Sequence, residues 1–387
     1  MAVAIVAGAV ANKCDNGGEA WVRLSWIRGL QKLGFDVFFV EQITSQNCRD
    51  ASGKTTAFEA SRNCKYFQKV IEDFNLGSHA ALIYEGGKEI WGLSRQDLLD
   101  AADAAVLLVN ISGHLDVPFL MDRIRHKAYI DIDPGYTQLW HAQGNDGARL
   151  AGHDSYFTIG ENIGRAECRI PTNGIPWRTT RQPVVLDDWP VTLTDNPRSF
   201  TTVANWRGGY GAIEFQGKKL GQKAHEFRKY LDLPQRTEAK YEIALQIHPQ
   251  DVADRNALEK HHWHLVTPHR VAATPDSFRQ YVQQSGAEFS VAQGIYVDTR
   301  SGWFSDRSVK YLASGKPVLV QDTGLGTRYS TGEGLVLFQD LDGAQLGVER
   351  IRSNYEDHCC AARQIAESHF DSDKVLGRLI EELELVT

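Results

Sequence analysis

The chain has 387 residues, a formal net charge of −7 and 42% hydrophobic residues. At roughly 150 residues per domain, this length predicts two or three domains, and the apolar content excludes a mainly disordered chain. The small excess of acidic residues argues against a nonspecific nucleic-acid binder. No apolar run reaches the length of about 20 residues that a membrane-spanning helix needs.

The N-terminus and the cysteines both indicate a cytoplasmic protein. The opening stretch, MAVAIVAGAVANKC, has no basic residues before its apolar run, so we interpret it as a buried strand and not as a signal peptide. The six cysteines lie far apart except for the adjacent Cys359 and Cys360, and no CxxC occurs. This usage is typical of a reducing compartment.

The first half of the chain alternates predicted strands and helices. Its predicted strands are 3–10, 35–41, 80–84, 105–111, 127–132 and 154–159, the last of this half, and its predicted helices are 19–33, 57–74 and 94–101. Strand, helix and strand in succession imply a parallel sheet with right-handed crossovers. In the helix 94–101, Ser94 and Asp97 have the spacing of a capping box.

Five of the 12 prolines fall within residues 171–197, which makes this stretch a poor helix and a poor central strand. We interpret it as the crossing between two domains, and a long loop within one domain is the alternative. The pattern then restarts, with predicted strands at 200–206, 241–247, 263–267, 288–292 and 316–321 and predicted helices at 224–231, 274–284, 306–314 and 373–383.

The predicted fold class is therefore α/β, with two Rossmann-like, doubly wound domains in tandem. We place the N-terminal domain at 1–198, the C-terminal domain at 199–370, and a last helical segment, 371–387, that could pack back on the first domain. Two such sheets place a ligand cleft between the domains, at the carboxyl ends of their strands.

The segment from Gly302 to Ser308 is the strongest candidate for a phosphate site. A predicted strand feeds a loop whose end caps a helix, and a helix start offers free N–H groups and a positive dipole end. Ser305 is a good cap, Asp306 and Ser308 flank it, and Arg307 could add a charge-assisted contact. An ordinary capped helix is the alternative interpretation.

The stretch SVKYLASGKPVLVQDTG, residues 308–324, resembles the closing nucleotide-binding motif of GT-B glycosyltransferases, a helix of the type LEAMAxGxPVV followed by a strand and a glycine turn. The resemblance implies two Rossmann-like domains and a nucleotide-diphosphate sugar donor held by the second domain. It also implies that Gly17 and Gly18, after the first strand, approach the donor phosphates.

One departure from the family pattern concerns two glutamates that many retaining members carry eight residues apart. The corresponding positions here are Gly302 and Lys310, and neither is acidic. Ribose and phosphate contacts are then expected to differ, with Asp306 and Arg307 as candidates, and a retaining mechanism is not implied.

The first domain must supply the acceptor site and any general base. His114 follows the predicted strand 105–111, and a neutral imidazole there could accept a proton from an acceptor hydroxyl. Asp133 also ends a strand and could orient His114 or act as the base, or form a turn before Pro134. Weaker candidates for contacts with a substrate are His153, Asp154, Asp15 and Asn16.

Three further residues complete the predicted donor-binding set. Lys223 could direct a cation at the diphosphate, with a solvated turn as the alternative. Arg207 lies in the glycine-containing loop after the strand 200–206. In the family, a loop such as Thr267-Pro268-His269 contacts the nucleotide base through backbone groups, and here a plain turn is the alternative.

We expect no metal site and no cofactor other than the nucleotide sugar. The run His261-His262-Trp263-His264 lacks a completing Cys or acid, and alternate residues of a strand point to opposite faces. The Asp-x-Asp triplet, a metal motif of another glycosyltransferase fold, occurs at 131–133, 340–342 and 371–373, as short patterns do by chance.

The sequence thus predicts a metal-independent hexosyltransferase-type enzyme. Its donor would be UDP-, TDP- or GDP-linked, its acceptor a small molecule or glycan, and a homodimer is possible. The alternatives are a GT-B-like nucleotide-sugar epimerase and a non-catalytic two-domain sugar- or nucleotide-binding protein of the periplasmic type, which would need export.

Overall fold

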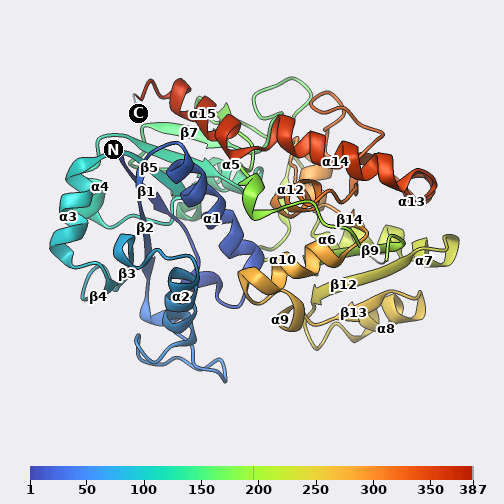
Figure 1. Cartoon of the computed structure of the whole chain (residues 1–387), viewed down its shortest axis with the longest axis horizontal. Helices are drawn as coiled ribbons and strands as arrows, with labels where there is room; N and C mark the ends of the chain where they lie inside the picture. The colour runs from blue at the N-terminus through green and yellow to red at the C-terminus, as the bar shows by residue number, and fades with distance from the viewer. Residues whose placement is uncertain (195, 386–387) are drawn as a thin grey trace.

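A computed structural model describes residues 1–194 and 196–385 of the chain. Two α/β domains lie side by side, with the first part of the chain forming one, the middle and later parts forming the other, and the last helix lying back over the first (Figure 1). The predicted crossing includes residue 195 and the predicted terminal segment includes residues 386–387, and these three lie outside the described residues.

The N-terminal domain is built on an eight-stranded sheet of order β4-β3-β2-β1-β5-β6-β7-β8, parallel except for β4. Its strands are β1 (Val3–Ala7), β2 (Asp36–Ile43), β3 (Ala80–Tyr84), β4 (Glu89–Gly92), β5 (Ala105–Ile111), β6 (Lys127–Asp131), β7 (Ser155–Thr158) and β8 (Arg178–Thr179). Its helices are α1 (Gly17–Lys32), α2 (Arg62–Asp73), α3 (Arg95–Ala104), α4 (Pro118–Met121) and α5 (Tyr136–Ala142).

The central strand β1 is buried on both faces, as a parallel sheet requires. Ala4 and Val6 pack with the apolar residues of α1 and α2, whereas Ile5 and Ala7 pack with those of α3 and α4. This two-sided burial explains why the strand reads as one continuous apolar run.

The C-terminal domain has a six-stranded parallel sheet of order β13-β12-β9-β14-β15-β16 and a separate hairpin, β10-β11. The strands are β9 (Ser199–Asn205), β10 (Ile213–Phe215), β11 (Lys218–Leu220), β12 (Lys240–Gln246), β13 (His264–Val266), β14 (Ala287–Ser290), β15 (Val318–Gln321) and β16 (Leu335–Phe338). The helices are α6 (Lys223–Phe227), α7 (Leu233–Arg236), α8 (Val252–Lys260), α9 (Pro268–Val271), α10 (Pro275–Gln284), α11 (Gly294–Thr299), α12 (Asp306–Ala313), α13 (Leu341–Ser353), α14 (Tyr355–His369) and α15 (Ser372–Glu382).

The two domains share one continuous apolar core. Trp21 of α1 packs edge-on against Trp189 of the crossing, with ring centroids 5.0 Å apart, and Trp189 contacts Phe278 of α10. The Trp21 indole N–H donates to the backbone oxygen of Pro275 at 2.8 Å. The last helix, α15, returns to pack on α1, where a Cβ on Gly29 would lie 2.6 Å from Leu376.

The structure confirms most of the predicted elements. The strands 80–84 and 105–111 agree at both ends, and the capping box of Ser94 and Asp97 is present. The expectation that 154–159 is the last strand of its half is wrong, because β8 adds a two-residue strand beside β7. The sequence reading also missed the two long helices α13 and α14 and the hairpin β10-β11.

Two expectations concern features away from the sheets. Within the described ranges, none of the helices combines the length and apolarity needed to cross a membrane. All six cysteines are free thiols, including the adjacent Cys359 and Cys360.

Candidate active site between the domains

Residues from both sheets meet where their strands end. From the N-terminal domain come the start of α1 and the loops after β5 and β6, which carry His114 and Asp133. From the C-terminal domain come the loop after β14 and the start of α12. The domains are closed on each other at this edge, since Asn162 Nδ2 donates to the backbone oxygens of Arg300 and Gly324, both at 3.0 Å.

Asp133 is the carboxyl group best suited to exchange a proton near neutral pH. Burial, and then the charges of the neighbouring Glu19 and Asp131, raise the pKa of Asp133 to about 6. The hydroxyl of Tyr296, in the opposite domain, donates a long hydrogen bond of 3.4 Å to Asp133 Oδ1. A carboxylate with this pKa is a stronger proton acceptor than an ordinary aspartate.

Asp131 holds the loop that carries Asp133. Its carboxylate is fully buried and accepts hydrogen bonds from Thr137 (2.7 Å), Gln138 (2.8 Å) and Thr158 (2.7 Å). The N–H of Asp133 also donates to Asp131 Oδ1, at 3.1 Å. Both oxygens of Asp131 are therefore occupied by hydrogen bonds from the protein. For this reason the Asp-x-Asp triplet at 131–133 is not arranged as a metal site.

His114 has the geometry of a hydrogen-bond donor. Arg149 Nη1 lies 3.2 Å from His114 Nδ1, and because a guanidinium cannot accept, the hydrogen of the neutral ring is on Nε2. Burial, and then the charges of Arg23 and Arg149, lower the pKa of His114 to about 3. The free ring nitrogen of His114 thus carries a hydrogen in this geometry, and the role of His114 as the base stays a prediction.

Sequence reasoning missed a buried ion pair at the start of α1. Arg23 is only 1% exposed and pairs with Glu19 one turn earlier in the helix, while its Nε atom has no hydrogen-bond partner. Gly8, just after β1, makes room for it, because a Cβ there would lie 3.0 Å from Arg23 Cγ. The Glu-x-x-x-Arg spacing was visible in the sequence, but it is equally common on exposed helix faces.

Lys310 is buried at the position where the family pattern has its second glutamate. Its side chain is 1% exposed, and Nζ lies 3.4 Å from Asp306 Oδ2. Burial lowers the pKa of Lys310, with a smaller opposing effect from Asp306. Asp306 thus pairs with Lys310 in this structure, and its predicted contact with the donor stays a prediction.

Arg307 is fixed to the end of the second sheet. Its Nε donates to the fully buried Glu288 at 2.5 Å, Nη1 donates to the Val203 oxygen at 2.9 Å, and Nη2 donates to Ser290 Oγ at 2.8 Å. Ser305 caps α12 as predicted, by accepting from the Arg307 N–H at 3.3 Å. The guanidinium is therefore held in one orientation beside the helix start.

Lys223 joins this group from the start of α6. Its Nζ donates to the backbone oxygen of Val291 at 2.5 Å. Burial, and then the charge of Arg307, lower the pKa of Lys223 to about 7, and Glu288 opposes the shift. Arg307 is the ion-pair partner of Glu288, and among the described residues Lys223 has no ion pair with a carboxylate.

A small hollow of about 10 Å³ lies at the start of α12, which is room for about one water. Ser305, Ser308 and Trp303 line it together with residues after β14 and β15. Ser308 Oγ is buried and has no hydrogen-bond partner among the described residues. An unpaired buried hydroxyl beside a capped helix start is a feature that a ligand oxygen would satisfy.

The structure assigns three other predicted donor residues to packing or to other partners. The N–H of Gly17 donates to the Ala272 oxygen at 2.8 Å, so it is not free for a phosphate. Gly18 packs on Phe278, where a Cβ would lie 3.1 Å from the ring. Arg207 forms an ion pair with Asp251. His269 is exposed on the short helix α9, and its predicted contact with a nucleotide base stays a prediction.

The weaker candidates have structural partners. Asp15 pairs with Arg62, and Asn16 caps α1 by accepting from the Glu19 N–H at 3.2 Å. His153 Nδ1 lies 3.1 Å from the Leu150 oxygen. Asp154 accepts from the Lys127 N–H at 2.8 Å.

The structure gives no metal-binding arrangement to the triplets or the histidine run. Asp340 and Asp371 are helix caps, of α13 and α15. Across residues 1–194 and 196–385, no group of three or more His, Cys, Asp or Glu side chains is placed to hold a metal ion.

An aromatic strap crosses from the second domain to the first. Tyr210, in the loop before β10, packs on Tyr136 and Trp140 of α5 with ring centroids 5.1 and 4.6 Å apart. Tyr296 stacks on Trp303 at 4.4 Å. Tyr136 and Tyr296 are buried, so these ring contacts hold the two domains together, and Tyr210 is the exposed ring of the group.

No family model and no curated protein matches this sequence. Solved structures do share the fold. Anabaena HepE in complex with UDP and glucose superposes with a TM-score of 0.58 at 9% identity, covering 99% of this chain and 100% of that chain. HepE in complex with UDP-glucose gives 0.55 at 9% identity, covering 99% of each chain.

A glycosyltransferase from Rickettsia africae gives a TM-score of 0.50 at 8% identity, covering 98% of this chain and 97% of that chain. At these identities the likeness establishes the fold. The chain has the two-domain GT-B fold over nearly its whole length, which confirms the fold class predicted from the sequence.

Proposed function

We propose that this chain is a glycosyltransferase that moves a sugar from a nucleotide-diphosphate sugar, UDP-linked, to a hydroxyl group of a small-molecule or glycan acceptor. The shared fold supports this proposal, and the similar HepE structures were solved with UDP, glucose and UDP-glucose. Fold alone does not define an activity, so the proposal depends on the chemistry of the site.

The observation that carries the proposal is the pair of cations at the start of α12. Arg307 is held there by Glu288, and the charge of Arg307 acts on the buried Lys223. Arg307 lies in the first turn of α12, which also carries the unpaired hydroxyl of Ser308. A diphosphate leaving group needs donors and positive charge held in place before the reaction, because such preorganised groups stabilise the charge that develops.

Asp133 is the proposed proton acceptor. The acceptor hydroxyl would give its proton to the Asp133 carboxylate while its oxygen forms the bond to the anomeric carbon of the donor sugar. The bond from that carbon to the diphosphate oxygen breaks, and the nucleoside diphosphate leaves on Lys223 and Arg307. The Nε2–H of His114 would donate a hydrogen bond to a substrate oxygen and position the substrate.

Turnover by this site is expected not to need a divalent metal. Lys223, Arg307 and the helix N-terminus can neutralise the diphosphate, which is the task that a metal performs in other transferases. The rate of nucleotide release should therefore stay unchanged in excess EDTA. A complete loss of turnover that Mg²⁺ or Mn²⁺ restores would contradict this expectation.

The function is tested by incubating the full chain with UDP-, TDP- and GDP-linked sugars and a panel of hydroxyl acceptors. We expect acceptor-dependent release of UDP and a new glycoside by mass spectrometry, both absent from Asp133→Asn. Lys219→Gln, at an exposed position of the hairpin strand β11, is the control and should behave as the wild type. UDP release that needs no acceptor would favour the epimerase, and nucleotide binding without turnover a binding protein.

A further inference from the structure

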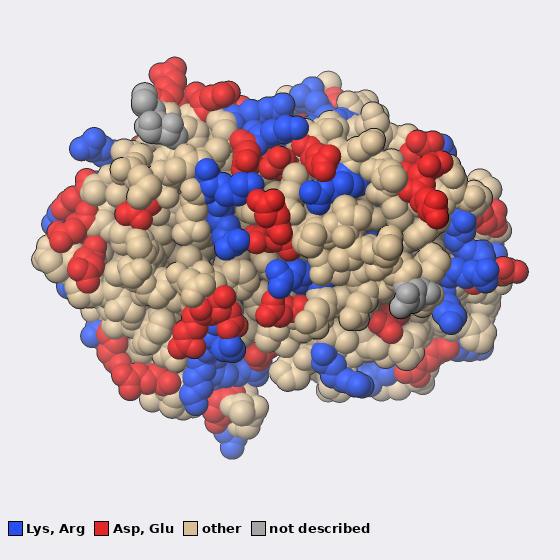
Figure 2. All heavy atoms as spheres, viewed as in Figure 1, with Lys and Arg blue, Asp and Glu red and all other residues tan. Residues whose placement is uncertain are grey.

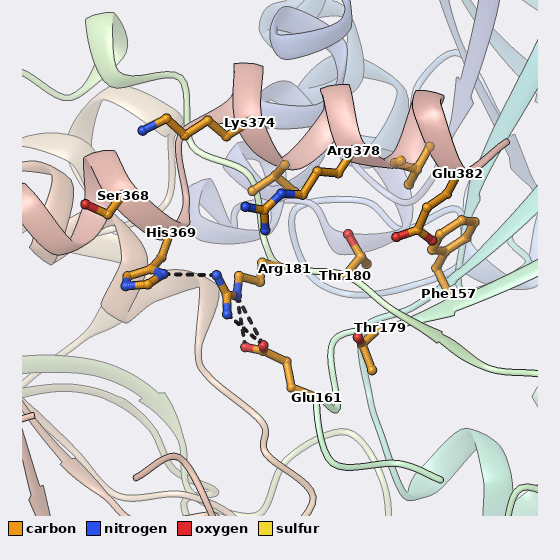
Figure 3. A pocket seen from close by; sticks show the side chains of 12 residues that line it. Phe157, Glu161, Thr179, Thr180, Arg181, Ser368, His369, Lys374, Arg378 and Glu382 are labelled. Atoms are coloured by element: carbon orange, nitrogen blue, oxygen red, sulfur yellow. Dashed lines mark hydrogen bonds and ion pairs between the residues drawn. The ribbon is translucent and has the colours of Figure 1, made fainter. Parts of the chain in front are cut away.

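A second cavity lies apart from the proposed donor and acceptor sites, where α14 and α15 meet the N-terminal sheet (Figure 3). Its volume is about 200 Å³, whereas a single water needs only about 10–15 Å³. One wall comes from β7, β8 and the residues after them, and the other from the end of α14 and from α15.

Arg181 forms the anchored end of this cavity. Its Nε and Nη2 atoms donate to Glu161 at 3.0–3.2 Å, its Nη1 atom lies 3.1 Å from His369 Nδ1, and its guanidinium lies 4.9 Å from the centre of the Tyr329 ring. Glu161 is thereby neutralised, and it also accepts from the Tyr329 hydroxyl. Arg181 keeps one N–H on each terminal nitrogen for a ligand.

His369 stands at the same end and helps to hold Arg181. Because Arg181 cannot accept, the Nδ1 atom of His369 is the acceptor and the ring hydrogen is on Nε2. Burial, and then the charge of Arg181, lower the pKa of His369. The Nδ1 side of the ring faces Arg181, and the other ring nitrogen points away from it (Figure 3).

Two cations of α15 line the opposite wall. Lys374 and Arg378 lie one helical turn apart, and Figure 3 shows Arg378 pointing toward Arg181, whereas Lys374 extends away from it. Lys374 Nζ donates to the Glu367 backbone oxygen at 2.9 Å, and within the described residues Arg378 makes no hydrogen bond or ion pair. In Figure 2, Lys and Arg atoms gather at the upper edge of the viewed face, where Figure 1 has α14 meeting α15.

The far end of the cavity has a different character. Phe157 and Leu379 provide apolar surface there, and the Glu382 carboxylate stands beside Phe157 (Figure 3). A guanidinium pair suits an oxyanion, and a carboxylate next to an aromatic face suits hydroxyl groups on a small carbon skeleton. The two ends together select a ligand with one anionic and one polyhydroxylated part.

We propose that this cavity binds a small phosphorylated sugar or polyol, with its phosphate between Arg181 and Arg378. Lys374, which also lines the cavity, would add positive charge, and the carbon skeleton would lie toward Phe157 and Glu382. This inference does not depend on the proposed transferase activity, because none of these residues belongs to the donor or acceptor sites.

The cavity lies next to contacts that join the two domains. Tyr329, which packs under Arg181, belongs to the C-terminal domain, and Asn162, next to Glu161, bonds the Gly324 backbone of the loop that follows β15. A bound phosphate would tie α15 and β8 to this loop. It is therefore expected to stabilise the closed arrangement of the two domains.

The test is calorimetry of the full chain with hexose 6-phosphate and, separately, with inorganic phosphate. We expect saturable binding of the sugar phosphate, weaker binding of inorganic phosphate, and at least about tenfold weaker sugar-phosphate binding by Arg378→Gln and by Lys374→Gln. Lys260→Gln is the control. It removes an exposed cation on α8, which does not line the cavity, and should bind as the wild type. All variants should keep wild-type affinity for UDP.

Three results would overturn the proposal. The first is the absence of sugar-phosphate binding up to about 10 mM, ten times a weak Kd of about 1 mM. The second is equal binding by the wild type, Arg378→Gln and Lys374→Gln, which would place the ligand elsewhere. The third is competition between sugar phosphate and UDP for one site.

Discussion

The two halves of the proposed active site treat charge in opposite ways. In the N-terminal domain, Asp133, whose pKa is raised to about 6, stands beside a Glu19–Arg23 pair in which the two charges offset each other. In the C-terminal domain, Lys223 and Arg307 outnumber Glu288. The comparison separates the tasks: the first half is built to take up a proton and the second to hold an anion.

Burial is the common cause behind both halves. It raises the pKa of Asp133 to about 6 and lowers the pKa of Lys223 to about 7, because a low-dielectric environment favours the neutral form of either group. Asp133 becomes a proton acceptor that recovers its carboxylate near neutral pH. The charged form of Lys223 is the form that a bound anion would stabilise.

The largest effect is expected from the first half. Asp133→Asn should lower kcat by about 10²- to 10⁴-fold, the usual contribution of a general base. In the wild type, the rate should rise with pH through about 6, because the acceptor form is the ionised carboxylate and the pKa of Asp133 is raised to that value. Initial rates over a pH series measure both effects.

The matched control for this variant is Tyr296→Phe, which removes the 3.4 Å hydrogen bond to Asp133 and keeps the carboxyl group. It should cost less than about tenfold in kcat, as a long neutral hydrogen bond contributes little. Wild-type turnover by Asp133→Asn would remove the base from this domain and leave the leaving phosphate as the proton acceptor.

The second-largest effect is on stability. Arg307→Ala should lower the free energy of unfolding by about 3–5 kcal/mol, because it leaves Glu288 buried without its partner. The double variant with Glu288→Gln should recover part of that loss. Denaturant titrations check this, and an Arg307→Ala chain as stable as the wild type would show that the guanidinium is not held by the sheet.

A smaller effect is expected at His114. His114→Ala should lower kcat by about tenfold or less, because the ring supplies one hydrogen bond and no proton transfer. His114→Gln, which keeps an N–H donor, should lie nearer the wild type. Loss of the pH dependence near 6 in His114→Ala, together with a fall of about 10²-fold or more, would return the role of base to the imidazole.

The sequence predicted the parts of the molecule that follow local rules. The capped helix start at Ser305 and the positions of Asp133 and His114 after their strands are read from neighbouring residues. The helices α13 and α14 were missed because their turns mix polar and small residues, and only packing on the second sheet decides their structure.

The contacts that determine each side chain's role could not be read from local sequence. Arg307 meets Glu288 from another element, and Arg149 reaches His114 across 35 positions of the chain, which fixes the tautomer of the ring. Arg23 resembles a surface residue of an amphipathic helix, and only the glycine after β1 allows it to be buried. The sequence therefore predicted which loops form the site, but it could not predict the ion-pair partners and protonation states of their side chains.

The most direct test of the account is calorimetric titration of UDP into the wild type and Lys223→Gln from about pH 7 to about pH 9, where the diphosphate is fully ionised. At pH 7, Lys223→Gln should bind about 10- to 100-fold more weakly. Wild-type affinity should fall as pH rises above about 7, because binding must then protonate Lys223, whose pKa is lowered to that value in the free protein. Lys223→Gln should show no such dependence, and equal affinities of the two proteins throughout this range would contradict the placement of the donor diphosphate.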